Sequence, residues 1–190
     1  MDAIHTLLDE HRSMAAVLHG MLYLVREIRL HGATPNFRAF HAMVYYIDAF
    51  IERFHHPKED NYLFRLLRLR YPDSAELIRR LESEHRAGSE KIRLLEQTLT
   101  RYEEGGASEF GAFAEAVQSY AAFHWDHMRA EEEHVIPLAR THLTVDDWNE
   151  IAAAFSGHSD PLFGVASSEH YDDLFRRVVN LTPAPIGLGP

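Results

Sequence analysis

Histidine is the residue type best able to do chemistry in this chain of 190 residues, which has 14 histidines and no cysteine. Two of the histidines are followed four positions later by a glutamate: His55 precedes Glu59, and His127 precedes Glu131. Residues four apart lie on one face of an α-helix, so the two side chains of each pair can bind the same metal centre. Imidazole and carboxylate without thiolate suit iron or manganese, and zinc is an alternative.

A single histidine precedes each pair at a similar distance, so the whole pattern occurs twice. His11 in the segment Glu10-His11-Arg12 matches His85 in the segment Glu84-His85-Arg86. A duplicated helical hairpin would place one site at its centre, on a pseudo-twofold axis.

The four repeated histidines are also expected at one level of a helical bundle. With the rise of an α-helix, His11 lies about 29 Å before the first turn between helices, and His55 lies about 27 Å after it. His85 and His127 each lie about 29 Å from the turn near residue 106. Four imidazoles and two carboxylates are too many for one tetrahedral ion and fit two ions bridged by the carboxylates. The predicted metal ligands are His11, His55, Glu59, His85, His127 and Glu131.

The other histidines are expected to be surface or partly buried residues. His19 and His41 lie at other levels, about 17 and 6 Å from the first turn. His56 adjoins a predicted ligand and is expected to face another direction. His124 lies one turn before His127, where it is a candidate for supporting a ligand. Four neighbouring carboxylates either orient the ligand imidazoles from outside or are plain surface groups: Glu10, Asp60, Glu84 and Glu132.

Helices must position these residues, because apolar side chains recur at steps of three and four nearly throughout. The predicted helices span about 2–30, 37–70, 74–104 and 109–142, with breaks at segments that contain glycine or proline. Pro57 is expected to kink the second helix without ending it. Asp73 with Glu76, and Ser108, are expected to cap the third and fourth helices. Strand signals are absent, so an all-α, up-down-up-down four-helix bundle is predicted over residues 1–142.

Residues 143–190 are predicted to be an appendage packed on the bundle and not a second domain. Thr144 and Asp147 form the capping box of a short helix that ends near Phe155. A second short helix is expected from Glu169 to Asn180, followed by an irregular tail.

Composition excludes several classes of protein. The absence of cysteine excludes disulfide scaffolds, iron–sulfur clusters and thiol nucleophiles. The net charge of -10 argues against nucleic acid as a partner. No apolar run approaches the length of a membrane span, and the first residues lack the features of a signal peptide. We therefore expect a soluble cytoplasmic protein without a membrane partner, while the oligomeric state stays open.

The repeated pattern resembles the hemerythrin-like, HHE cation-binding domain, in the H–HxxxE–H–HxxxE form of its bacterial members. The resemblance covers about residues 1–142 and rests on His11, His55-His56-Pro57-Lys58-Glu59-Asp60, His85 and His127-Met128-Arg129-Ala130-Glu131-Glu132. It implies a four-helix bundle around a non-haem di-iron centre with a bridging oxo or hydroxo group. His11 and His55 would serve one iron, and His85 and His127 the other. Glu59 and Glu131 would bridge the irons, with Glu132 as the alternative to Glu131.

The sequence departs from the oxygen-carrying hemerythrins at one position. Those proteins have a further histidine one turn after the ligand of the third helix, and Ser89 stands there in this chain. The resemblance then implies six protein ligands and an open position on each metal. This arrangement argues against simple reversible oxygen carriage and suits peroxide or nitric oxide chemistry.

Two functions of different classes follow. The first is a di-iron protein that binds or reacts with O2, H2O2 or NO, with weak peroxide- or NO-consuming activity as its form of catalysis. The alternative is an iron- or oxygen-responsive regulatory or interaction module without turnover, which presents a surface of residues 144–190 to a partner. A ferritin-like oxidase is rejected, because it would use Glu-x-x-His pairs in place of His-x-x-x-Glu.

Overall fold

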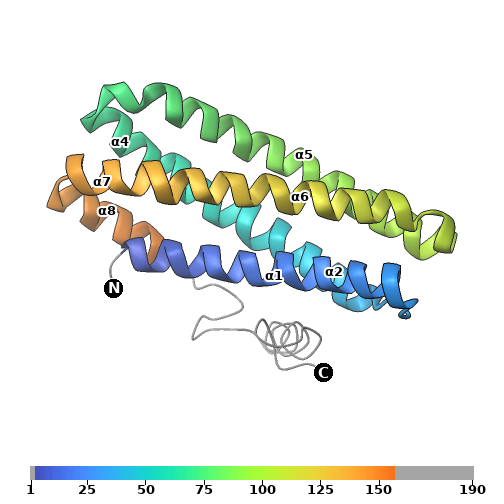
Figure 1. Ribbon diagram of the computed structural model, residues 1–190. Helices are drawn as coiled ribbons and strands as arrows, with labels where there is room; N and C mark the ends of the chain where they lie inside the picture. Colours follow the sequence, from blue (N-terminus) through green and yellow to red (C-terminus); the bar gives the residue numbers. More distant parts are fainter. Residues whose placement is uncertain (1–2, 157–190) are drawn as a thin grey trace.

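The computed structural model describes residues 3–156, which form a bundle of antiparallel helices (Figure 1). The chain runs along the bundle four times, and each run is called a crossing here. The first and third crossings are single helices, α1 (Ala3–His31) and α5 (Ala75–Gly105). The second crossing is one helical run of five segments: α2 (Phe37–Tyr46), η1 (Ile47–His55), α3 (His56–Lys58), η2 (Glu59–Phe64) and α4 (Arg65–Arg70). The fourth consists of α6 (Phe110–Ala130), η5 (Glu131–Val135) and α7 (Ile136–His142). The predicted up-down-up-down bundle is confirmed, and no strand occurs in the described residues.

Both crossings that contain a proline change from α- to π-helix near it. η1 ends at His55, two residues before Pro57, and η5 ends at Val135, two residues before Pro137. A proline ring collides with the carbonyl four residues earlier in an α-helix, and the wider i→i+5 turn relieves that contact. The helical run therefore continues through Pro57, as predicted, with the π-segment η2 directly after it. As a result, the candidate ligands His55, Glu59 and Glu131 all lie in π-helical segments.

The expected caps of the third and fourth helices are wrong. α5 follows a 3-10 turn, η3 (Pro72–Ser74), in which the Ser74 hydroxyl donates a hydrogen bond to the carbonyl of Tyr71. α6 follows a second such turn, η4 (Gly106–Ser108), where the Ser108 hydroxyl donates to the carbonyl of Gly105. In both places the serine bonds backward into the turn, so its side chain does not cap the helix that follows.

Two apolar clusters fill the bundle, one on each side of the level of the repeated histidines. The larger contains residues from Met14 to Val25 of α1, with their neighbours on the other crossings. The smaller contains Ala3, Ile4 and Leu7 together with residues of η2, α4, α5, η5 and α7. On the first three crossings the buried histidines lie between residues of the two clusters, and on the fourth His124 and His127 lie among the last residues of the larger cluster, before those of the smaller one. Within residues 3–156, no helix is long and apolar enough to cross a membrane.

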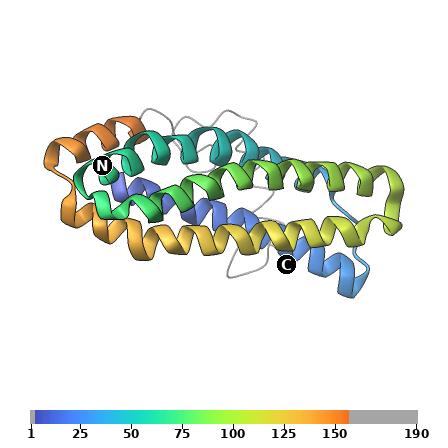
Figure 2. The same ribbon diagram turned by 90° about the horizontal axis from the view of Figure 1, so that it is seen from above.

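A short fifth helix, α8 (Val145–Ser156), folds back beside the start of α1 (Figures 1 and 2). The backbone N–H and the hydroxyl of Thr144 donate to Asp147 at 2.8 and 2.7 Å, and the Asp147 N–H donates back to the hydroxyl at 3.2 Å. The predicted capping box is thus confirmed. Ile151 and Phe155 are buried in the smaller cluster. The second short helix and tail that we predicted lie outside the described residues.

Asp147 should contribute to the docking of α8. Arg70 donates to its carboxylate at 2.8 Å, and this bond, with those from Thr144, holds the Asp147 pKa well below its usual value. The Asp147→Ala variant should lose about 1 kcal/mol of stability at pH 7, the usual cost of a lost cap, and melt a few degrees lower. Because the folded pKa is depressed, this difference should shrink as the pH falls below about 4. Thermal unfolding followed by circular dichroism measures it.

The neighbouring Asp146 is exposed and serves as the matched control. An Asp146→Ala variant that loses as much stability as Asp147→Ala would contradict the assignment.

Candidate metal centre

Glu59 lies at the centre of the bundle, between imidazoles from three crossings. Its carboxylate is fully buried and lies 3.4 Å from His55 Nε2, 3.9 Å from His11 Nε2 and 3.5 Å from His85 Nε2. The first two histidines belong to the same half of the repeat as Glu59, and His85 belongs to the other half. Glu59 therefore joins the two halves, as a bridging carboxylate must.

Glu131 repeats this arrangement from the other half. Its oxygens lie 3.3 Å from His127 Nε2, 3.8 Å from His85 Nε2 and 3.4 Å from His11 Nε2. Its neighbour Glu132 is 45% exposed and its carboxylate accepts a hydrogen bond from the outer nitrogen of His11. The geometry thus places Glu131 inside the centre and Glu132 outside it.

Each of the four histidines turns Nδ1 away from the centre, toward a carboxylate. Two of these carboxylates act within one half of the repeat. Glu10, which precedes His11, lies 2.7 Å from His55 Nδ1, and Glu84, which precedes His85, lies 2.8 Å from His127 Nδ1. Such bonds fix the tautomer so that Nε2 faces inward.

The other two carboxylates act between the halves. Asp60 lies 2.8 Å from His85 Nδ1, and Glu132 lies 2.9 Å from His11 Nδ1. The four carboxylates that the sequence left open between two roles therefore all orient an imidazole.

The donor atoms fit metal ions in kind and in placement. Among the described residues, both oxygens of Glu59 and of Glu131 and the Nε2 atom of His11 are buried without a hydrogen-bond partner. Unpaired buried carboxylates are costly, and a cation held between them removes the cost. Two groups have all their donor atoms within 4.8 Å of one another: His11, His55 and Glu59, and His56, Glu59, His85 and His127.

His56 is therefore placed differently from the sequence-based expectation. Its side chain is 3% exposed, and its ring stacks on that of His85 with centroids 4.1 Å apart. That expectation rests on α-helical spacing, in which neighbouring side chains diverge by about 100°. η1 ends and α3 begins between His55 and His56, and both rings are buried there.

Lys58 is a further residue that sequence reasoning missed. It is 7% exposed, and its ammonium lies 3.1 Å from the Glu10 carboxylate and 4.6 Å from the ring centroid of Phe155 on α8. The equivalent position in the second half of the repeat is Ala130, so this contact has no counterpart there.

The other histidines among residues 3–156 lie outside both metal-binding groups. His41 bonds to Glu103 on the surface, and His19 is exposed beside the ring of Trp125. His124 is fully buried, and its Nε2 lies 3.8 Å from Glu52.

The charges of the buried groups are set by the balance of burial against their neighbours. Burial alone lowers the pKa of His85, but the neighbouring carboxylates of Asp60, Glu131 and Glu59 outweigh it and raise the value to about 10. For His127 burial is outweighed by the neighbouring carboxylates of Glu131 and Glu84, and the pKa rises to about 9. Burial together with the neighbouring charge of His11 lowers the pKa of His55 to about 3, despite the attraction of Glu59. At neutral pH the metal-free centre thus favours the cationic form of His85 and His127 and the neutral form of His55.

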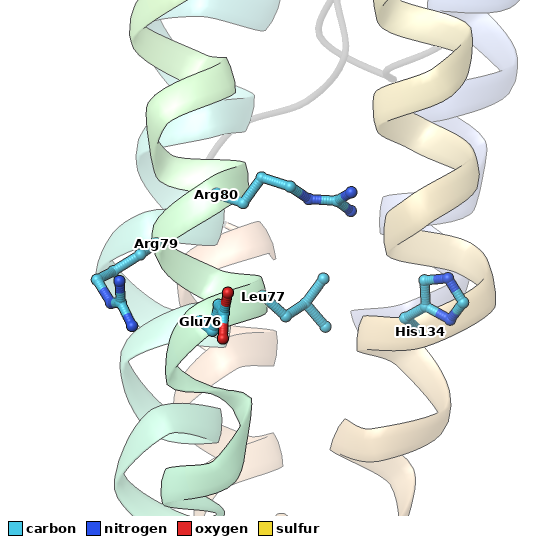
Figure 3. Close-up of a pocket in the computed structure, with 5 residues that line it drawn as sticks. All are labelled: Glu76, Leu77, Arg79, Arg80 and His134. Carbon is cyan, nitrogen blue, oxygen red and sulfur yellow. The ribbon is translucent and has the colours of Figure 1, made fainter.

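A surface pocket of about 640 Å³ lies between α5 and η5, away from these residues (Figure 3). In Figure 3 the side chain of Arg80 extends from α5 toward the helix that carries His134. The lining contains none of the candidate ligands: Glu76, Leu77, Arg79, Arg80 and His134. Its link to the centre is indirect, because Arg80 lies 3.6 Å from Glu84, which holds His127.

The family model of the hemerythrin HHE cation-binding domain matches residues 2–139. The chain belongs to this family. No curated protein and no solved structure matches the chain. The HHE domain covers all four crossings of the bundle and both groups of buried donor atoms, so its histidines and glutamates form a candidate cation site.

Metal binding by the HHE domain should release protons. In the metal-free protein the pKa of His85 is raised to about 10 and that of His127 to about 9, and the pKa of His11 is also raised, so a metal must displace protons from these imidazoles at neutral pH. The apparent affinity should therefore rise with pH until about pH 9–10, where His85 and His127 become neutral. Isothermal titration calorimetry of Zn²⁺ binding, in buffers with different enthalpies of ionisation, counts the released protons. An affinity that is constant between pH 6 and 9 would contradict this protonation pattern.

Proposed function

We propose that this HHE domain is a non-haem di-iron protein that binds or reacts with O2, H2O2 or NO. The observation that carries the proposal is the pair of buried carboxylates, Glu59 and Glu131. Each lies within 4 Å of imidazole nitrogens from both halves of the repeat. Neither has a hydrogen-bond partner among the described residues.

Two ions fit this site better than one. His11 and His55 share one group of neighbouring donor atoms with Glu59, and His85 and His127 share another, so the donors divide into two sets that suit one ion each. Two cations also balance the two buried carboxylates more completely than one. Imidazole and carboxylate donors without thiolate favour iron, with manganese or zinc as competitors.

The protein's own contribution is orientation and exclusion of water. The four outer carboxylates aim the imidazoles inward, and Phe64 stacks on His85 at 5.5 Å between ring centroids. The apolar clusters on either side close the bundle around the centre. Iron bound there would supply the redox chemistry and the positions for small ligands, while the chain limits which molecules reach it.

Metal analysis of the full chain, purified without chelator, tests the proposal first. We expect about two irons per chain and near-ultraviolet absorption bands of an oxo-bridged pair in air. Consumption of H2O2 or NO by the loaded protein then tests reactivity. A chain that takes up at most one metal, or only colourless zinc, would overturn the di-iron assignment.

Removal of a predicted ligand should remove metal. His55→Ala and Glu131→Ala should each lose most of the bound iron, because each deletes a donor that the remaining residues cannot replace. His19→Ala should keep the full amount, since this side chain is exposed and outside both groups. Iron per chain after gel filtration measures the effect. Full retention in both ligand variants would rule out the centre as drawn.

A second function is an iron- or oxygen-responsive module without turnover. It is favoured by a series of side-chain contacts that connects the candidate metal centre to α8. Phe155 of α8 covers the Lys58 ammonium, Lys58 bonds to Glu10, and Glu10 orients His55. A change at the metal can thus reach the appendage through three side chains. This function predicts no consumption of peroxide or NO. It predicts instead that proteolysis of the segment after α7 differs between the loaded and the metal-free protein.

A further inference from the structure

A buried polar cluster that the proposed function does not use lies beside the centre, around Glu52. Glu52 lies near the middle of η1, and its side chain is 3% exposed. Its carboxylate accepts hydrogen bonds from the Ser89 hydroxyl at 2.9 Å and from the Tyr120 phenol at 3.1 Å. Gly88 makes room for it, because a Cβ there would lie 3.0 Å from Glu52 Oε1. Three crossings thus build a place for this carboxylate.

His56 lies between this cluster and the metal ligands. Its Nδ1 is 3.4 Å from Glu52 Oε2, one helical turn earlier in the chain. Its donor atom also lies within 4.8 Å of those of Glu59, His85 and His127. Neither ring nitrogen has a hydrogen-bond partner among the described residues. Glu52 is therefore a carboxylate next to His56, as Glu10 is next to His55, and the donor atom of His56 lies near three candidate metal ligands.

The two halves of the repeat differ at this position. The residue equivalent to His56 is Met128, which is packed in the larger apolar cluster. The extra imidazole thus belongs only to the group of His85 and His127. The group of His11 and His55 has no such addition within the described residues.

We propose that His56 is a seventh protein ligand, the third imidazole of the metal held by His85 and His127, and that Glu52 is its positioning residue. This inference rests on the proposed di-metal centre. It changes the expectation drawn from Ser89, that both metals keep an open position. With His56 bound, the exchangeable position is confined to the metal held by His11 and His55. Small ligands such as azide, NO or peroxide then bind on that side alone.

A pair of matched variants tests the assignment. His56→Met installs the residue that the repeat itself carries at the equivalent position, so volume is kept, and a thioether is a poor ligand for iron. His124→Met is the control, because His124 is just as buried, its ring stacks on that of His56, and it lies outside both metal groups. Competition with a chelator, in full-length protein loaded with Fe²⁺ without oxygen, measures the affinity of each metal.

We expect His56→Met to weaken one of the two metals by about 100-fold and leave the other unchanged, while His124→Met keeps both. Glu52→Gln should weaken the same metal by about 10-fold, as loss of an orienting partner does. In His56→Ala, added imidazole should restore the second metal, because the stacked rings of His85 and His124 leave a slot of its shape. A merely structural role of His56 would give no such rescue.

The wild-type protein gives a test that does not depend on any variant. Azide, titrated against the oxidised di-iron form and followed by absorption, should bind once per pair of irons. Two azides per pair, or two tightly held metals in His56→Met, overturns the role of His56 and leaves the proposed function intact. Equal loss of metal in His124→Met also overturns it. A wild-type chain that holds at most one metal overturns both.

Discussion

The pairing of inward-facing imidazoles with carboxylates on other crossings is the interaction on which the centre of this bundle depends. A buried histidine next to a buried glutamate is costly unless the orientation of its ring is fixed and its outer nitrogen has a partner. Here Glu10 and Glu84 supply that partner within each hairpin, and Asp60 and Glu132 supply it between the hairpins. Two of the four bonds thus tie the halves together, and neither hairpin completes the arrangement alone. The inner carboxylates, Glu59 and Glu131, can then face one another's histidines without being drawn outward by a competing hydrogen bond.

The π-helical segments allow the second and fourth crossings to contribute to this layer. η1 and η5 each end two residues before a proline, whose collision with the preceding turn the wider spacing relieves, and η2 begins two residues after Pro57. The change of helix type alters which side chains point inward over a few residues. In the second crossing it brings both His55 and His56 to the core, together with Glu59. α5, which is a regular helix, contributes His85 alone among the metal-binding groups. The second crossing, which contains two π-helical segments, thus contributes more candidate donor residues than the regular helix α5.

Much of this could be predicted from the sequence, because α-helical spacing and rise suffice for it. The number of residues per helical turn and the rise per residue predict the bundle. They also predict that the four repeated histidines share one level and lie close to Glu59 and Glu131: His11, His55, His85 and His127. His56 could not be placed, because its inward direction depends on where η1 gives way to α3. Glu52 could not be recognised, because its burial depends on Gly88, Ser89 and Tyr120 from other crossings. The spacing from Glu52 to His56 was the available signal, since it equals that of the His-Glu pairs. Lys58 was missed for a similar reason, because its partners lie on α1 and α8.

The position of the histidine layer between two apolar clusters has a consequence for how the molecule unfolds. Hydrophobic burial stabilises each end of the bundle separately, and the polar layer between them adds little of it. Without metal, only helix backbones and a set of charged pairs connect the two ends, so we expect two foldons of unequal size. The end with α8 contains the smaller cluster and is expected to open first. A bound pair of cations would cross-link all four crossings at the boundary and merge the two foldons into one cooperative unit. Metal binding would then increase the cooperativity of unfolding, and the increase would be detectable at residues far from the metal ligands.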